Sequence, residues 1–373
     1  MTEMTDSPRR WMARALQLAR RGEGRTAPNP PVGALLVRDG QLIGEGFHPR
    51  AGEPHAEIFA LRQAGELARG ADLYVTLEPC SHQGRTGPCC AAIIAAGVRR
   101  VFVGCADPNP QVNGRGLAWL RQAGLQVQCG ILEAQARRLI AAFAKHQRSG
   151  RPLVILKTAA TLDGRTATAS GASQWITNAA CREQVHRLRD RVDAILVGVG
   201  TVLRDDPRLT CRAPGGRDPL RLVLDSRLRI PDSAALLSLD SPAPTLIATT
   251  ALACPARRAA LAGRSGVELL ELPADASGGV SLPALLDELG RRGLLSLLVE
   301  GGARVNQAFL QQRLIDRLML YFGAKLLGGG DGKGLFDGPG PLDLADALPV
   351  RDIRLRRFGD DLLLEGELAC SPD

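Results

Sequence analysis

The sequence predicts an α/β protein of two domains, an α/β/α layered domain followed by a second α/β domain. A chain of 373 residues is long enough for two or three domains that each bury a core. In both halves short apolar segments alternate with helical patterns, which is typical of a sheet covered by helices. The polar stretch 145–152, which ends in Gly-Arg-Pro, separates the two patterns. We therefore predict domains over residues 1–147 and 148–373.

The first domain is predicted to begin with a helix that Ser7 caps, with Pro8 at the first helical position. Asp39-Gly40 lies between two apolar stretches, a pattern that favours a β-hairpin. The elements predicted after this helix are strands over Gly33–Arg38 and Leu42–Gly46, a helix over His55–Leu67, a strand over Asp72–Leu77, a helix near Cys90–Ala96 and a strand over Arg100–Cys105.

The second domain repeats the alternation, so an open sheet is predicted here too. No Gly-x-Gly-x-x-Gly opens a strand–turn–helix unit, which disfavours a standard Rossmann dinucleotide site. Gly359-Asp360 predicts a closing hairpin over Ile353–Glu367. The predicted strands are Leu153–Thr158, Asp193–Val199, Leu220–Leu224, Thr245–Ala248, Val267–Leu272 and Leu295–Glu300, and the predicted helices are Asn178–Arg189, Ser281–Arg291 and Ala303–Arg313.

Composition and charge favour an enzyme that acts on a small molecule. No segment approaches the roughly 18 apolar residues that cross a bilayer, and no signal-peptide pattern is present, so we expect a cytoplasmic protein with no membrane partner. The net charge of +8 comes from scattered arginines and only 3% of residues are aromatic, which favours a phosphorylated small substrate and no nucleic-acid partner. Nine cysteines, an odd number, indicate reduced thiols rather than a disulfide framework.

Four residues of the first domain have the types and order of a catalytic zinc site. His55 stands at a predicted helix start, Cys80 follows a strand, and Cys89 stands at a second helix start. One imidazole and two thiolates suit Zn²⁺ and leave the fourth tetrahedral position for a water molecule, whose pKa the metal lowers. Glu57, two residues after His55, can carry protons from that water to departing ammonia.

The third ligand could be either of two neighbours, Cys89 or Cys90. Pro88 is predicted at the first helical position, which places Cys89 in the first turn, where the helix dipole favours a thiolate. We favour Cys89 because a residue next to Pro88 is better placed to face the loop than the helix core. The cysteines without metal-like spacing are Cys105, Cys129, Cys181, Cys211, Cys254 and Cys370.

These motifs resemble the cytidine-deaminase-like superfamily, whose signature is His-x-Glu followed by Pro-Cys-x-x-Cys. Here eight residues separate the cysteines, and the stretch 76–90 closely resembles the bifunctional riboflavin-biosynthesis deaminase–reductases. The resemblance implies that Asn29 sits against a pyrimidine and that His82 and Arg85 lie near the substrate's polar groups or phosphate. Other stretches that resemble this family are 26–33 (TAPNPPVG), 52–57 (GEPHAE), 107–110 (DPNP) and 114–116 (GRG).

In the second half, the stretches 157–167, 173–177, 197–207 and 299–302 resemble the reductase domain of the same family. This implies a dihydrofolate-reductase-like fold that uses NADPH. From the residues alone, Glu300-Gly301-Gly302 is either a tight turn or a place where N–H groups hold a pyrophosphate. The residues that the resemblance places at the cofactor are Ala159, Trp175, Thr201, Asp205, Gly301 and Gly302. Those that it places at the substrate are Ser173, Arg189, Leu209, Arg212 and Glu300, with the two arginines on the phosphate. It also implies that Lys157 or Asp205 polarises the reacting ribose.

The resemblance covers nearly the whole chain and implies two successive reactions. The first is zinc-dependent deamination of 2,5-diamino-6-ribosylamino-4(3H)-pyrimidinone 5′-phosphate, and the second is reduction of the product's ribose to a ribityl chain by NADPH. A homo-oligomer formed through the second domain is also implied. One rival function is deamination of a base in nucleic acid, against which the cysteine spacing and the few aromatics count. The other is a structural zinc module, which would normally supply four protein ligands.

Overall fold

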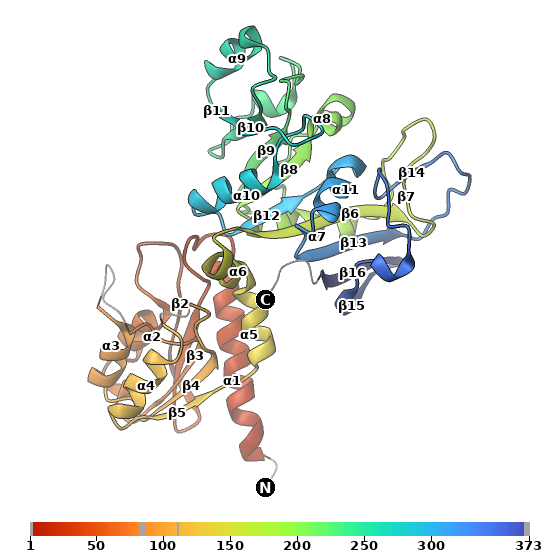
Figure 1. Cartoon of the computed structure of the whole chain (residues 1–373). Helices are drawn as coiled ribbons and strands as arrows, with labels where there is room; N and C mark the ends of the chain where they lie inside the picture. Colours follow the sequence, from red (N-terminus) through yellow and green to blue (C-terminus); the bar gives the residue numbers. More distant parts are fainter. Residues whose placement is uncertain (1–2, 82–86, 110–111, 369–373) are drawn as a thin grey trace. The chain divides into compact units, whose positions relative to one another are not determined.

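Helix α6 (Ala141–Ser149) ends where the chain divides into two units, Met1–Gly150 and Arg151–Asp373. This division lies beyond the expected boundary at residue 147 because the polar segment continues as helix until Gly150, whose positive φ of 70° ends it. Each unit is described by itself (Figure 1). The computed structural model describes residues 3–81, 87–109 and 112–368.

The first unit is built on a five-stranded sheet. In spatial order its strands are β2 (Gln41–Phe47), β1 (Gly33–Arg38), β3 (Asp72–Leu77), β4 (Arg100–Cys105) and β5 (Gln126–Cys129). β1 is antiparallel to β2 and β3, whereas β3, β4 and β5 are parallel, so the carboxyl ends of these three meet at one edge. Asp39 and Gly40 join β1 to β2 with φ angles of 50° and 75°, as a two-residue hairpin turn requires. The predicted hairpin is confirmed.

Helices cover both faces of this sheet, because successive strand residues point to opposite sides. Leu35 packs with Met12 on one face, while Leu36 packs with Ala60 on the other. The predicted α/β/α arrangement is therefore confirmed (Figure 1). The first face carries α1 (Glu3–Ala19) and α5 (Glu133–Leu139), and the second carries α2 (Ala56–Ala64), α3 (Cys89–Ala95) and α4 (Arg115–Gln122), with 3₁₀ turns at Arg20–Gly22 and Gly65–Ala68.

Two helix starts depart from the prediction. Helix α1 begins at Glu3, so the prediction that Ser7 is its cap is wrong. Pro8 lies inside this helix, where its fixed φ is compatible with helical geometry and its ring costs one backbone hydrogen bond. Helix α3 begins at Cys89, one residue earlier than predicted, and Pro88 precedes it as the extended N-cap residue.

The second unit is built on a nine-stranded sheet that is parallel from its first strand to its seventh. In spatial order the strands are β11 (Val267–Glu271), β10 (Thr245–Thr249), β9 (Leu220–Leu224), β8 (Ala194–Gly198), β12 (Ser296–Val299), β6 (Leu153–Thr161), β13 (Arg317–Gly323), β16 (Asp361–Leu368) and β15 (Val350–Phe358). The predicted hairpin at the end of the chain is β15–β16, with Gly359 at a φ of 64° in its turn. A separate two-stranded ribbon joins β14 (Lys333–Gly334) to β7 (Arg165–Ala167).

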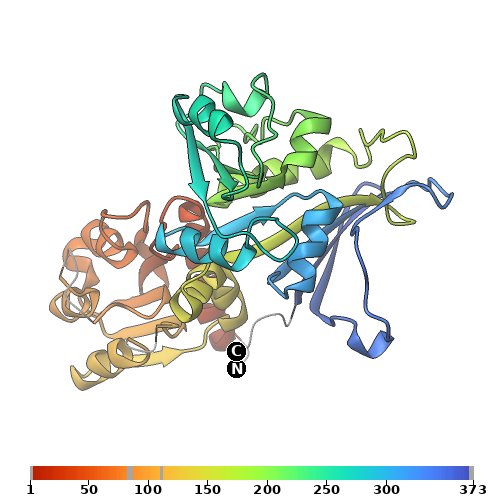
Figure 2. The ribbon, with the colours of Figure 1, turned by 45° about the horizontal axis from the view of Figure 1, so that its top comes forward.

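Helices pack on this sheet (Figure 2), and two of them, α10 and α11, contribute apolar side chains to its core. Leu285 and Leu289, one turn apart, are buried against the sheet with Phe309. None of the helices in the described part of the chain is both long and apolar enough to cross a membrane. The helices are α7 (Ala179–Arg191), α8 (Val199–Asp205), α9 (Pro255–Ala262), α10 (Leu282–Arg291) and α11 (Ala303–Gln311), with 3₁₀ turns at Ala235–Leu237 and Leu344–Asp346.

Candidate metal centre and reductase site

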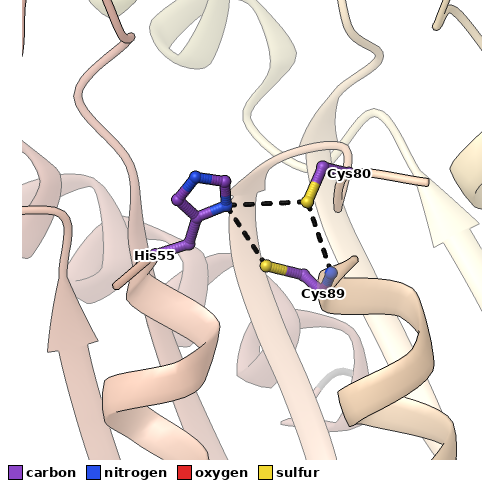
Figure 3. Close-up of side chains that lie close together, drawn as sticks. All are labelled: His55, Cys80 and Cys89. Carbon is purple, nitrogen blue, oxygen red and sulfur yellow. Dashed lines mark hydrogen bonds between the residues drawn. The ribbon is translucent and has the colours of Figure 1, made fainter. Parts of the chain in front are cut away.

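Three side chains of metal-ligand type converge in the first unit (Figure 3). His55 immediately precedes α2, Cys80 lies in the loop after β3, and Cys89 is the first residue of α3. The His55 Nδ1 atom lies 3.3 Å from Cys89 Sγ and 3.6 Å from Cys80 Sγ. A nitrogen and a sulfur atom that bind the same zinc ion at ordinary bond lengths, with a tetrahedral angle between the bonds, are about 3.5 Å apart. The three side chains are therefore spaced as zinc ligands.

Local hydrogen bonding favours the thiolate form of Cys80. The Cys89 backbone N–H donates to Cys80 Sγ over 3.3 Å. Hydrogen bonding with the Cys89 side chain, with His55 and with this N–H outweighs burial and lowers the pKa of Cys80. The thiolate is the form of cysteine that binds metal.

The side chain of Cys90 points away from this cluster. Its thiol is fully buried and donates to the backbone carbonyls of Pro79 and Gly116, at 3.4 and 3.6 Å. Burial raises the pKa of this thiol to about 12. Of the two neighbouring cysteines, the structure thus brings Cys89 to His55 and Cys80. Within the part of the chain that is described, this cluster has three members.

Glu57 lies in the first turn of α2, beside the cluster. The residue is only 3% exposed, and among the described residues its Oε2 atom has no hydrogen-bond partner. Burial raises the pKa of Glu57, because the charged form is poorly solvated there. A carboxyl group that holds a proton readily suits the role of proton carrier predicted for this residue.

A cavity of about 500 Å³ opens beside these side chains within the first unit. His55, Glu57 and Cys80 line it, and so do Asn29 and His48. The position predicted for Asn29, in a substrate pocket, is therefore compatible with its place in the structure. The predicted substrate contacts His82 and Arg85 lie outside the described residues.

His48 is a residue of this cavity that the sequence reasoning missed. Its Nδ1 atom lies 3.1 Å from the Pro54 carbonyl oxygen, which can only accept, so Nδ1 carries the hydrogen. The Nε2 atom, 3.1 Å from Asn29 Nδ2, must then accept from the Asn29 amide. Burial lowers the pKa of His48, which favours this neutral form. His48 therefore orients Asn29, and its place shortly before His55 in a chain with five histidines was the available signal.

Several residues predicted for the second site, among them Thr201, Glu300 and Gly301, lie where β8, β12 and β6 end side by side. These strands are neighbours and parallel, so the segments that follow them meet at one edge of the sheet. The N–H of Gly302 donates to Thr201 Oγ1 over 3.0 Å, and the Gly301 carbonyl accepts from the Gly198 N–H at 3.0 Å. The turn that opens α11 is thus joined to the start of α8.

Glu300 is the charged centre of this edge. Arg189 donates to its two carboxylate oxygens at 2.9 Å each, and Lys157 Nζ lies 3.7 Å from Oε2. Burial alone would raise the pKa of Glu300, but the charges of Arg189 and Lys157 outweigh it and lower the pKa to about 2. Glu300 is therefore ionised and held in place at neutral pH.

The other residues predicted for this site differ in burial and in their contacts. Arg212 is exposed and its Nε lies 3.0 Å from His186 Nε2, while Arg189 is occupied by Glu300 and by the Thr210 carbonyl. Trp175 is 57% exposed, with the Arg182 guanidinium 4.5 Å from its ring centre. The others are Ala159 in β6, Ser173 in the loop before α7, Asp205 at the exposed end of α8 and Leu209, which is buried with a φ of 52°.

Comparison with known proteins gives consistent matches over both units. The cytidine and deoxycytidylate deaminase zinc-binding region matches residues 5–105, and the RibD C-terminal domain matches residues 152–364. Riboflavin biosynthesis protein RibD of Escherichia coli is 45% identical over 367 residues, which cover 95% of this chain and 97% of that protein. The RibD of Bacillus amyloliquefaciens is 42% identical over 355 residues, which cover 95% and 94%.

Solved structures agree with these matches. Acinetobacter baumannii RibD has a TM-score of 0.84 at 40% identity and covers 98% of this chain and 99% of its own. A Thermotoga maritima diaminohydroxyphosphoribosylaminopyrimidine deaminase/5-amino-6-(5-phosphoribosylamino)uracil reductase has a TM-score of 0.84 at 35% identity, with 98% and 100% covered.

Proposed function

Because the chain belongs to the RibD family of riboflavin-biosynthesis enzymes, which join a zinc-dependent deaminase to an NADPH-dependent reductase, we propose that residues 1–147 carry the first activity and residues 148–373 the second. The proposed first substrate is the 2,5-diaminopyrimidinone ribosyl phosphate, in line with the reaction for which the Thermotoga maritima relative is named. The deaminated product would then be the substrate of the reductase.

The observation that carries this proposal is the convergence of His55, Cys80 and Cys89 beside a buried Glu57, at a cavity that His55, Cys80 and Glu57 line. These three residues would hold the zinc ion, which when bound supplies the Lewis acidity that activates water near neutral pH. A structural zinc site would normally have four protein ligands, whereas the cluster in the described residues has three. The arrangement thus favours catalysis over a purely structural role.

The protein's own groups account for binding and proton transfer in the deamination. Asn29, held by His48, offers its amide oxygen to the pyrimidine edge. Glu57 accepts a proton from the attacking water and passes it to the ring amine, which departs as ammonia. The second proton of the water moves to the ring nitrogen as the carbonyl forms. Burial supports this role, since a carboxyl with a raised pKa can hold the proton between the two steps.

In the reductase site NADPH supplies a hydride, and the protein mainly positions the reacting groups. Gly301 and Gly302, with Thr201, would approach the cofactor, together with Ala159, Trp175 and Asp205. Glu300 and Lys157 would contact the ribose, with Lys157 as the candidate polarising group. Ser173, Arg189 and Leu209 complete the proposed substrate site, and the exposed Arg212 is the arginine better placed to meet a phosphate.

We also propose that the protein is a cytoplasmic homo-oligomer that associates through the second unit. β15 is an edge strand of the nine-stranded sheet, and Ile353 and Leu355 on it are 55% and 65% exposed. A second copy that packs on this strand would cover these two apolar side chains, which supports association here.

The test is a coupled assay on the full chain with the diaminopyrimidinone ribosyl phosphate. We expect zinc-dependent ammonia release, and NADPH oxidation only after deamination has begun. Ammonia without NADPH oxidation would overturn the reductase assignment and leave the deaminase assignment standing. A zinc-loaded, folded chain that releases no ammonia would overturn the substrate assignment, and single-stranded nucleic acid would be the next substrate to assay.

A further inference from the structure

Glu78 is a buried carboxylate that the mechanism above does not use. It follows β3 directly and is only 4% exposed. Its Oε2 atom accepts from the N–H groups of Asp107 and Gly114, at 3.1 and 3.0 Å. Its Oε1 atom accepts from the N–H groups of Gly116 and Leu117, at 2.8 and 3.2 Å. One side chain thus satisfies four backbone donors that lie 29 to 39 positions further along the chain.

These donors bracket one wall of the deaminase cavity. Asp107 and Asn109 line that cavity, and so does Val112. Gly114 is the N-cap residue of α4, with a φ of 79°, and Gly116 belongs to the first turn of this helix. Glu78 therefore ties both ends of the wall segment to the end of β3.

The same contact brings α4 against the loop that carries Cys80. A Cβ atom on Gly116 would lie 2.2 Å from the Pro79 carbonyl oxygen, so only glycine permits this approach. The Cys90 N–H donates to the Cys80 carbonyl over 3.2 Å, and the Cys90 thiol donates to the Gly116 carbonyl. The start of α4 is thus packed against Pro79 and Cys80, next to Glu78.

The chemistry of the contact requires a carboxylate. Each carboxylate oxygen has two acceptor sites, so four N–H donors fill the group completely. An amide at this position would accept at its oxygen only and would turn its own N–H groups toward two of the donors. The negative charge is also favoured at the N-terminus of α4 by the helix dipole.

We propose that Glu78 is a positioning residue for deamination, which sets the place of the cavity wall bearing Asp107 and Asn109 relative to the Cys80 loop. Glu78 also lines the cavity, but the backbone fills its acceptor sites, so its part is to hold the wall and not to bind the substrate. The inference rests on the proposed function, because it assumes that the cavity binds the pyrimidine.

The test compares full-length wild type with Glu78→Gln and with Asp72→Asn as the matched control. Asp72 opens the same strand β3, has a side chain 11% exposed and binds Arg100, away from the cavity. For Glu78→Gln we expect the KM of deamination to rise about tenfold or more, because two donors lose their acceptors. Its kcat should stay within about twofold, with zinc content and NADPH oxidation of the deaminated product unchanged. Asp72→Asn should leave the KM unchanged.

Hydrogen exchange provides a readout that does not depend on activity. Peptides from residues 112–120 should exchange faster in Glu78→Gln than in wild type or Asp72→Asn, whereas peptides from α2 should not change. Unchanged exchange, an unchanged KM or loss of zinc from Glu78→Gln would each overturn the proposal. If wild type fails to deaminate the substrate, the proposed function is wrong. The exchange comparison would still test whether Glu78 stabilises the backbone of residues 112–120.

A second variant covers the case in which Glu78→Gln does not fold. Gly116→Ala leaves the carboxylate intact but forces the start of α4 away from Pro79. We expect the same rise in KM with zinc retained. A Gly116→Ala chain with a wild-type KM would overturn the proposal.

Discussion

Arg189 binds both carboxylate oxygens of Glu300, from a position 111 residues earlier in the chain. The two side chains are 13% and 10% exposed, so the pair is shielded from water. Lys157 adds a second positive charge 3.7 Å from the same carboxylate. Two cations around one anion leave this edge of the sheet electropositive, which suits a phosphorylated substrate and a phosphate-bearing cofactor.

Substitution of Arg189 should lower the stability and the activity of the second unit and leave the first unit unchanged. Arg189→Ala leaves a shielded carboxylate with Lys157 as its remaining cation, so we expect the unit to lose about 2–4 kcal/mol of unfolding free energy. NADPH oxidation should fall at least about tenfold, with ammonia release unchanged. Urea unfolding followed by hydrogen exchange in the nine-stranded sheet measures the first effect.

Arg187→Ala is the control for this prediction, because Arg187 lies on the same helix and pairs with Glu183 while both side chains are 57% exposed. An exposed pair of this kind contributes less than about 1 kcal/mol. If Arg187→Ala and Arg189→Ala lose the same free energy of unfolding, the Arg189–Glu300 pair is no more stabilising than an exposed one, and the prediction is wrong.

Glu57→Ala should separate catalysis from metal binding. Because Glu57 is proposed to move protons and not to hold zinc, we expect unchanged zinc content and a fall in ammonia release of about 100-fold or more. NADPH oxidation with the deaminated product should persist. Metal analysis and the two assays check this, and loss of zinc from the variant would mean that Glu57 supports the metal centre itself.

The two neighbouring cysteines should respond differently to substitution. Cys89→Ala removes one of three proposed ligands, so the chain should lose zinc and deaminase activity together. Cys90→Ala should keep both, because the Cys90 sulfur lies among the backbone carbonyls of Pro79 and Gly116. We expect Cys90→Ala to lower the free energy of unfolding by about 1 kcal/mol, because the missing sulfur leaves a small cavity. Zinc loss from Cys90→Ala would contradict the ligand assignment.

Local sequence signals were sufficient where the structure depends on neighbouring residues. Asp39-Gly40 predicted the hairpin because its turn needs positive φ at both positions. The order of His55, Cys80 and Cys89 indicated a metal site because each stands at the end of a strand or the start of a helix.

Such local signals could not predict contacts between residues that lie far apart in the sequence. Glu78 could not be recognised as an anchor, because its four partners are backbone groups that any sequence possesses. The pairing of Arg189 with Glu300 likewise follows from the parallel packing of β8, β12 and β6, and not from any spacing. Strand β13 was not predicted, although the apolar run Leu318–Phe322 was a local signal for it.

Substituting His48 should weaken substrate binding without removing the metal. In His48→Ala the Asn29 amide loses the acceptor that fixes its orientation, so we expect the KM of deamination to rise about tenfold. The kcat should fall less, since His48 contacts no proposed proton carrier. Steady-state kinetics with parallel metal analysis checks this, and a fall in kcat at constant KM would count against the orienting role.

His186 should make the stability of the second unit depend on pH. Its ring nitrogens lie 3.2 Å from the Arg212 backbone nitrogen and 3.0 Å from Arg212 Nε, and both Arg212 groups are donors. The neutral ring can accept from only one of them, and a proton added to the ring would remove this acceptor. Burial, together with Arg189 and Arg212, lowers the pKa of His186 from 6.5 to about 4.

Between these pH values the unfolded chain binds more protons than the folded one. The stabilising contribution of the neutral His186 is therefore fully present above about pH 6.5 and declines as the pH falls toward 4. Glu300, with its pKa near 2, stays ionised throughout this window. In His186→Asn this decline should become shallower, which hydrogen exchange of α7 peptides in urea at pH values between about 7 and 4.5 would measure. A variant whose stability falls with pH as steeply as that of wild type would show that other groups carry the effect.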